Sequence, residues 1–126
     1  MSTVPEKWLE RARYDLETAQ AMRDSGRWLY VLFCCQQAIE KALKAVIAQR
    51  TKEFPPRLHN LVSLAEFAKI AVPEEKEGLF RILTDFYIGS RYPDEVREVG
   101  KDLGKANAER YLAETSEAFE WLRSML

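Results

Sequence analysis

The sequence predicts an all-α protein, an antiparallel up-and-down bundle of four long helices plus one short helix. The chain has only 5 glycines and 5 prolines in 126 residues, and they fall at intervals of helical length. No stretch alternates apolar and polar residues for long enough to indicate a strand. Apolar residues recur instead at spacings of three and four, which is typical of amphipathic helices.

The first expected helix begins after Thr3, a good capping residue, and has Pro5 in its first turn. It ends at Ser25 and Gly26, which favour a stop. Its apolar face consists of Trp8, Leu9, Ala12, Leu16, Ala19 and Met22. One apolar face predicts that this helix packs on one side only.

The second expected helix, residues 27–50, is apolar over more than half of its circumference. Its main stripe consists of Trp28, Leu32, Cys35, Ile39, Ala42, Leu43, Val46 and Ile47. Such a wide apolar face is typical of a central helix with several neighbours. Tyr30 and Phe33 fall outside this arc, either as surface aromatics or as part of a homodimer face.

Three further helices are expected in the second half of the chain. A short one begins near His59 or Asn60, and longer ones cover residues 74–90 and 105–125. The connection over residues 93–104 is longer than the roughly two to eight residues common between bundle helices. Long connections of this kind are often functional.

Composition indicates one globular domain over residues 1–126, with 47% hydrophobic and 31% charged residues. The net charge of −1 gives no general attraction to nucleic acid, so a site for it must be a local patch. No apolar stretch approaches the roughly 20 residues that span a bilayer, and the amino terminus is charged rather than signal-like. We therefore expect a cytoplasmic protein with no membrane partner.

The sequence has none of the common motifs for a metal or a cofactor. Its single histidine excludes the paired Glu-x-x-His motifs of a di-iron bundle, and the adjacent Cys34 and Cys35 lack the spacing of a chelating pair. A P-loop, a GxGxxG turn and a GxSxG elbow are also missing. We expect no metal and no cofactor.

Two polar residues lie inside or beside the predicted apolar faces. Asp15 needs a cation if it is partly buried, and Lys41, Lys44 and Arg91 are the candidates. A structural tie between helices is favoured over a catalytic role for this carboxylate. Gln36 lies in the apolar arc of the second helix, where its amide is expected to satisfy a neighbouring helix end, with ligand binding as the alternative.

His59 is a catalytic candidate because it is the only histidine. The favoured interpretation is that its ring caps the third helix or packs under the preceding loop, since no acidic partner stands near it in the sequence.

Residues 90–94, with the sequence SRYPD, are the most distinctive run in the chain. Arg91 offers a planar fork for phosphate oxygens and Tyr92 a surface on which a base can stack, which suits single-stranded RNA or a nucleotide. The alternative is that Arg91 forms a salt bridge with Asp15 or Asp94 and locks the turn. The candidate ligand-binding residues are Arg91, Tyr92, Asp94 and Arg97.

Several runs occur in the order seen in HEPN-domain proteins, and the sequence resembles this family over nearly its whole length. The runs are Trp8–Met22 (WLERARYDLETAQAM), Gln36–Val46 (QQAIEKALKAV), residues 59–61 (HNL) and residues 90–94. The resemblance implies an up-and-down helical bundle that usually forms a homodimer. It also implies a minimal nucleotidyltransferase as a partner, often in a toxin–antitoxin pair.

Many HEPN proteins are metal-independent ribonucleases whose motif is an arginine followed a few residues later by a histidine. In that motif the histidine moves protons and the arginine stabilises charge on the phosphate. Here the positions after Arg91 where the histidine would stand hold Val96, Arg97 and Glu98.

Three functions therefore remain open, and so does the question of whether the protein is an enzyme. The first is a partner of a nucleotidyltransferase that binds nucleotide or RNA near Arg91 and Tyr92. The second is a ribonuclease with a degenerate motif, for which Arg91 and His59 are the catalytic candidates. The third is a structural adaptor without catalysis.

Overall fold

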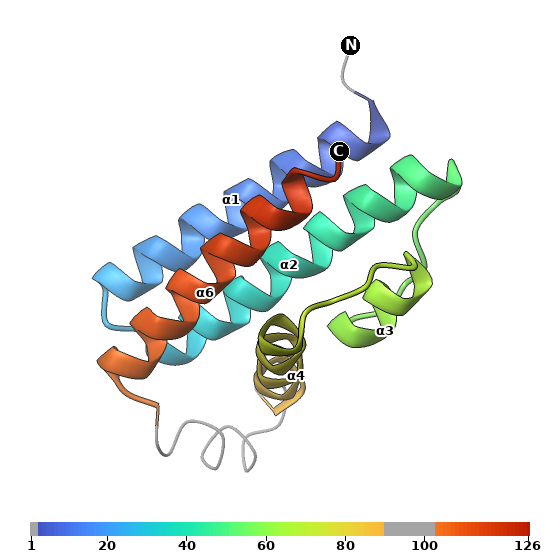
Figure 1. The fold of residues 1–126 in the computed structure, drawn as a ribbon. Coiled ribbons are helices and arrows are strands. Elements are labelled where there is room, and N and C mark those ends of the chain that lie inside the picture. Colours follow the sequence, from blue (N-terminus) through green and yellow to red (C-terminus); the bar gives the residue numbers. More distant parts are fainter. Residues whose placement is uncertain (1–2, 90–102) are drawn as a thin grey trace.

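The computed structural model describes residues 3–89 and 103–126, which form five α-helices and no strand (Figure 1). The helices are α1 (Val4–Asp24), α2 (Trp28–Thr51), α3 (Leu61–Phe67), α4 (Glu74–Gly89) and α6 (Lys105–Arg123). The predicted all-α class, with four long helices and one short one, is confirmed.

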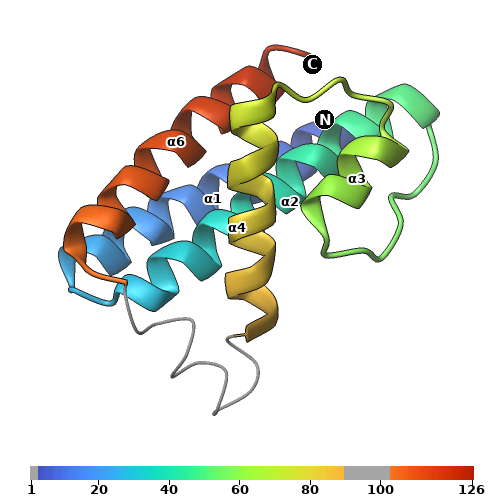
Figure 2. The same ribbon diagram turned by 60° about the horizontal axis from the view of Figure 1, so that its bottom comes forward.

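Three of the long helices lie side by side, and the fourth crosses them. Helix α2 runs antiparallel to α1, and α6 packs against both of them and also runs antiparallel to α1 (Figure 1). Helix α4 runs steeply across this group, and α3 packs on α2 beside α4 (Figure 2). Helix α2 contacts the other four helices, which confirms the central position expected from its wide apolar face.

Local sequence signals set the bounds of α1. The hydroxyl of Thr3 accepts a hydrogen bond from the Glu6 N–H at 3.3 Å, and the Glu6 carboxylate accepts one from the Thr3 N–H at 3.0 Å. This capping box satisfies two donors that the first helical turn leaves open. At the other end the chain turns at Gly26, whose φ of 73° is easily adopted only by glycine.

The core surrounds α2. Its largest fully buried hydrophobic side chains come from α2, α3, α4 and α6 and are Phe80, Phe119, Leu32, Ile39, Leu43, Ile47, Leu61, Leu64, Leu83, Leu122 and Val31. Within the described ranges no helix is both long and apolar enough to cross a lipid bilayer.

Candidate functional site

A row of polar side chains runs along the buried face of α2. Gln36, Glu40 and Lys44 follow one another at intervals of four residues, so they lie on the same side of the helix. Their exposed fractions are 0%, 4% and 7%. Polar groups at this depth destabilise the fold unless each one is paired. The row therefore needs a complete set of partners.

Glu40 is the centre of this row. Its Oε1 atom accepts a hydrogen bond from Gln36 Nε2 at 3.0 Å and lies 2.9 Å from His59 Nδ1. Its Oε2 atom accepts from Lys44 Nζ at 3.1 Å. Burial by itself raises the pKa of the Glu40 carboxyl, but the hydrogen bonds from His59 and Gln36 and the charge of Lys44 outweigh it and hold the pKa below the ordinary value. Glu40 is therefore a carboxylate at neutral pH, and it accepts a hydrogen bond from the Nδ1–H group of His59.

The loop before α3 presents His59 to this carboxylate. The backbone carbonyl of His59 accepts a hydrogen bond from Gln36 Nε2 at 2.9 Å, so Gln36 contacts both the carboxylate and the backbone of the histidine. The His59 ring lies 5.2 Å from the Tyr87 ring of α4, and 47% of its side chain is exposed. The imidazole is thus oriented on one side and open on another.

Aromatic rings continue from His59 through the buried Tyr87 to the surface at Tyr30. Tyr87 stacks on Phe33 with the ring centres 5.4 Å apart, and Phe33 meets the exposed Tyr30 edge-on at 6.2 Å. Tyr30 and Phe33, which fall outside the apolar arc of α2, thus extend the site rather than the core. Together with His59 and Tyr87 they form the aromatic row of the site.

Asn60, and not His59, caps α3. Its Oδ1 atom accepts a hydrogen bond from the Ser63 N–H at 3.1 Å. The interpretation of His59 as a capping ring is wrong, because its ring contacts α2 and α4 instead. The acidic partner is Glu40, which lies 19 residues earlier in the chain.

The structure pairs Asp15 with Lys41, which joins α1 to α2 in a partly buried contact. Lys44, another candidate for Asp15, binds Glu40 instead, and its Nζ atom lies 5.5 Å from the centre of the Trp8 ring. The two lysines of α2 therefore serve two different carboxylates.

The predicted ligand-binding corner lies outside the described residues. This applies to Arg91, Tyr92, Asp94 and Arg97. Tyr87, in the last turn of α4, lies beside the His59 ring. Arg91 comes shortly after Tyr87 in the sequence.

Glu40 is the functional residue that sequence reasoning missed. The available signal was a charged residue inside the apolar arc of α2, flanked at same-face spacing by Gln36 and Lys44. In the described part of the chain, no group of three or more histidine, cysteine, aspartate and glutamate side chains is placed to hold a metal ion.

Comparisons with known proteins agree with this fold. The crystal structure of TT1696 from Thermus thermophilus is similar, with 26% identity and a TM-score of 0.81 over 97% of this chain and 98% of that one. ST0689, an archaeal HEPN homologue, shares the fold, with 24% identity and a TM-score of 0.78 over 98% of each chain. Curated proteins give no match. The HEPN domain family matches residues 5–125, and the chain therefore belongs to the HEPN-domain family.

Proposed function

We propose that this HEPN-domain protein binds a nucleotide or single-stranded RNA near the end of α4, and that it is the partner of a minimal nucleotidyltransferase in a toxin–antitoxin-like system. The observation that carries the binding proposal is the His59 imidazole, oriented by Glu40 and packed against Tyr87. Arg91 and Tyr92 follow α4 in the sequence.

The chemistry of this end of α4 suits a nucleotide. The half-exposed imidazole of His59 offers a hydrogen bond, and the exposed ring of Tyr30 offers a stacking surface to an unpaired base. An arginine supplies two parallel donors for phosphate oxygens. With a net charge of −1, the protein depends on this local arrangement rather than on its overall field.

Binding is tested by the fluorescence anisotropy of a labelled single-stranded RNA and by equilibrium dialysis of ATP. Arg91→Ala is expected to weaken binding about tenfold, because hydrogen bonds to a charged group are the strong ones. Arg123→Ala at the far end of α6 removes the same charge and is the control, with less than about a twofold effect. Equal losses in both variants, or no binding by the wild type, would contradict the proposal.

The partner proposal rests on the family. Co-expression of the chain with a minimal nucleotidyltransferase encoded beside it, followed by affinity purification of one component, is expected to recover both. Recovery of one component alone, under conditions in which both are expressed and folded, would contradict the partner proposal.

A metal-independent ribonuclease is the second candidate, and the Glu40–His59 pair favours it. A carboxylate on Nδ1 that orients a half-exposed imidazole is the arrangement used by general acid–base histidines. Cleavage of labelled RNA in excess chelator, lost in both His59→Ala and Arg91→Ala proteins of matched melting temperature, would establish it. No cleavage by the wild type would leave the binding function.

The structural adaptor predicts a different result. In that case Arg91→Ala lowers the melting temperature while the wild type binds neither RNA nor ATP. A melting curve measured beside each titration therefore separates the adaptor from the binding function.

A further inference from the structure

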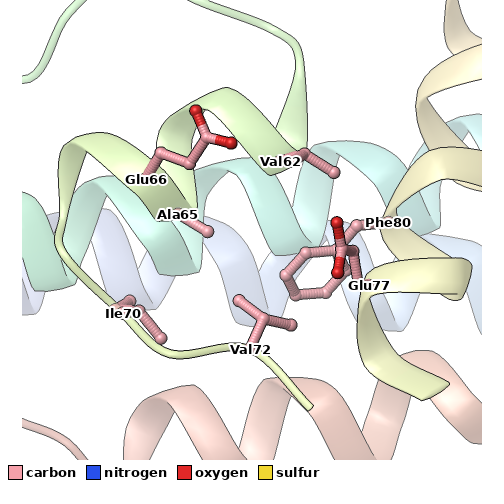
Figure 3. Close-up of a pocket in the computed structure, with 7 residues that line it drawn as sticks. All are labelled: Val62, Ala65, Glu66, Ile70, Val72, Glu77 and Phe80. Carbon is pink, nitrogen blue, oxygen red and sulfur yellow. The ribbon is translucent and has the colours of Figure 1, made fainter. Parts of the chain in front are cut away.

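A small pocket lies between α3 and α4, away from the aromatic row (Figure 3). Its volume is about 190 Å³, and it is lined by Val62, Ala65, Glu66, Ile70, Val72, Glu77 and Phe80. The side chains of Val72 and Phe80 point into the space between the two helices (Figure 3). Phe80 is fully buried and supports the pocket from below, whereas the half-buried Val62, Ile70 and Val72 give it its apolar surface.

The end of α3 builds one side of this pocket. Lys69 has a left-handed φ of 58°, its N–H donates to the Glu66 carbonyl, and the Ile70 N–H donates to the Ala65 carbonyl, both at 3.0 Å. This pair of bonds is a Schellman motif, which brings the residue after the turn back against the helix. Ile70 is thereby placed beside Ala65 on the wall. The Arg50 guanidinium fixes this turn by donating to the Ala68 carbonyl at 2.9 Å.

Two carboxylates stand on opposite sides of the apolar space, Glu66 on α3 and Glu77 on α4 (Figure 3). Glu77 is paired with Arg81 at 2.7 Å. Glu66 forms no ion pair with any residue that the structure describes. An exposed carboxylate without a counter-ion beside an apolar pocket attracts a cation to that place.

A second, polar chamber of about 400 Å³ adjoins the pocket and shares Val62 and Glu66 with it. It adds Arg81 and Asp85 to the lining. Across the two chambers the lining therefore holds three carboxylates and one cationic side chain. A ligand that enters from this side meets a negative field before it reaches the apolar walls.

We propose that this pocket binds a small organic ammonium ion with an apolar body, such as an arylalkylamine, with the body against Val62, Ile70 and Val72 and the ammonium group at Glu66. Apolar walls with a few placed polar groups are the usual make-up of a small-molecule site. The proposal goes beyond the nucleotide function. A polyanionic nucleotide is repelled by this rim, so the two ligands occupy different sites.

Phenethylammonium chloride is the probe, and phenethyl alcohol is its uncharged counterpart. Each is titrated into the full chain while the amide NMR shifts of Val62, Ala65 and Phe80 are followed. The ammonium ion is expected to bind with a Kd of about 1 mM, which is reasonable for so few atoms. The alcohol is expected to bind at least about tenfold more weakly, because it cannot pair with the Glu66 carboxylate.

Glu66→Gln keeps the shape of the side chain and removes its charge, and it lies at an exposed position where the fold tolerates it. This variant is expected to weaken binding of the ammonium ion about tenfold. Glu74→Gln, in the first turn of α4 and outside both linings, is the matched control and leaves binding unchanged.

Three results would overturn the proposal: no saturable shift with the ammonium ion, equal affinity for the alcohol, or equal losses in the two glutamine variants. Binding of a lysine-containing peptide without binding of phenethylammonium would assign the pocket to a protein side chain and would overturn it as well. None of these results bears on RNA binding at the end of α4, because the substituted residues are different.

Discussion

The carboxylate of Glu40 decides how the polar row of α2 behaves. Both of its oxygens are occupied, Oε1 by Gln36 and His59 and Oε2 by Lys44. A buried charge is tolerated when its partners are complete, and removing one partner leaves the others uncompensated. Glu40 therefore holds together three side chains that would otherwise destabilise the interior.

Glu40→Gln tests this arrangement. The variant is expected to lower the free energy of unfolding by about 2 kcal/mol, because Lys44 stays buried without a negative partner. Urea denaturation followed by circular dichroism measures the difference. Glu10→Gln on the exposed side of α1 is the control and changes the free energy of unfolding by less than about 0.5 kcal/mol. Similar values for both would contradict the role given to Glu40.

The lowered pKa of Glu40 gives its contribution a definite pH dependence. The carboxyl binds its proton more weakly in the folded state than at its ordinary pKa of 4.5, so the unfolded state binds more protons as the pH falls. The contribution of Glu40 to the free energy of unfolding is fully present above about pH 4.5, and it is lost as the pH falls through the pKa of the folded state. The difference between wild type and Glu40→Gln is expected to be constant near neutral pH and to shrink below about pH 4.5. A difference that grows on acidification would refute this sign.

Among the elements, α3 is the one that depends most on its neighbours. It has only 7 residues, too few for a stable isolated helix. Arg50 of α2 binds the carbonyl at its end, and Thr84 of α4 accepts a hydrogen bond from the Leu61 N–H at its start, at 3.2 Å. Contacts with two longer helices therefore stabilise α3, which is too short to be stable alone.

Thr84→Val removes the hydroxyl and keeps the shape of the side chain. It is expected to cost about 1 kcal/mol of unfolding free energy, because the buried Leu61 N–H loses its acceptor. Hydrogen exchange at Leu61 is expected to accelerate as well. Thr18→Val is the control, because that hydroxyl bonds only the Tyr14 carbonyl of its own helix. Unchanged exchange at Leu61 would show that the contact carries no stability.

At the scale of the whole molecule, the reactivity of the two adjacent cysteines measures how often the core opens. Cys35 is fully buried, and burial raises the pKa of its thiol to about 12, so almost no thiolate is present at neutral pH. Cys34 is only partly buried. A thiol reagent therefore reaches Cys35 only when the bundle opens.

A Cys34→Ser protein isolates this effect. Its remaining thiol is expected to react with a disulfide reagent at pH 7 only at the rate of global opening, and to react fully in urea. A Cys35→Ser protein, which keeps the more accessible thiol, is expected to react faster. Fast labelling of Cys35 in the folded protein would mean that α2 is not the closed centre of the bundle.

The homodimer that the resemblance to the family implies is a prediction for the whole molecule. Light scattering behind size exclusion is expected to give twice the 14.6 kDa of one chain. If the exposed Tyr30 belongs to the shared face, Tyr30→Lys is expected to give the mass of one chain, whereas Tyr14→Lys on α1 leaves the dimer intact. Dissociation by neither variant, or by Tyr14→Lys alone, would place the shared face elsewhere.

The helices were predictable because their signals are local. The cap at Thr3, the stop at Gly26 and the wide apolar arc of α2 each depend on residues within a few turns, and the structure has all three. The Glu40–His59 contact was not predictable in this way, because it joins a buried helix to a loop 19 residues away. The partner of Asp15 was narrowed to three cations by charge, but only tertiary geometry selects Lys41 among them.

The segment from His59 to Tyr87 contains α3 and most of α4, and its two ends lie side by side. Its two ends touch through their rings, 5.2 Å apart, and the Leu61–Thr84 hydrogen bond fastens it just inside that contact. Closing such a loop costs conformational entropy, and the ring contact and the hydrogen bond at its two ends offset this cost. Loss of the Leu61–Thr84 hydrogen bond would therefore loosen the start of α3 and the second half of α4 together, and with them the orientation of the imidazole.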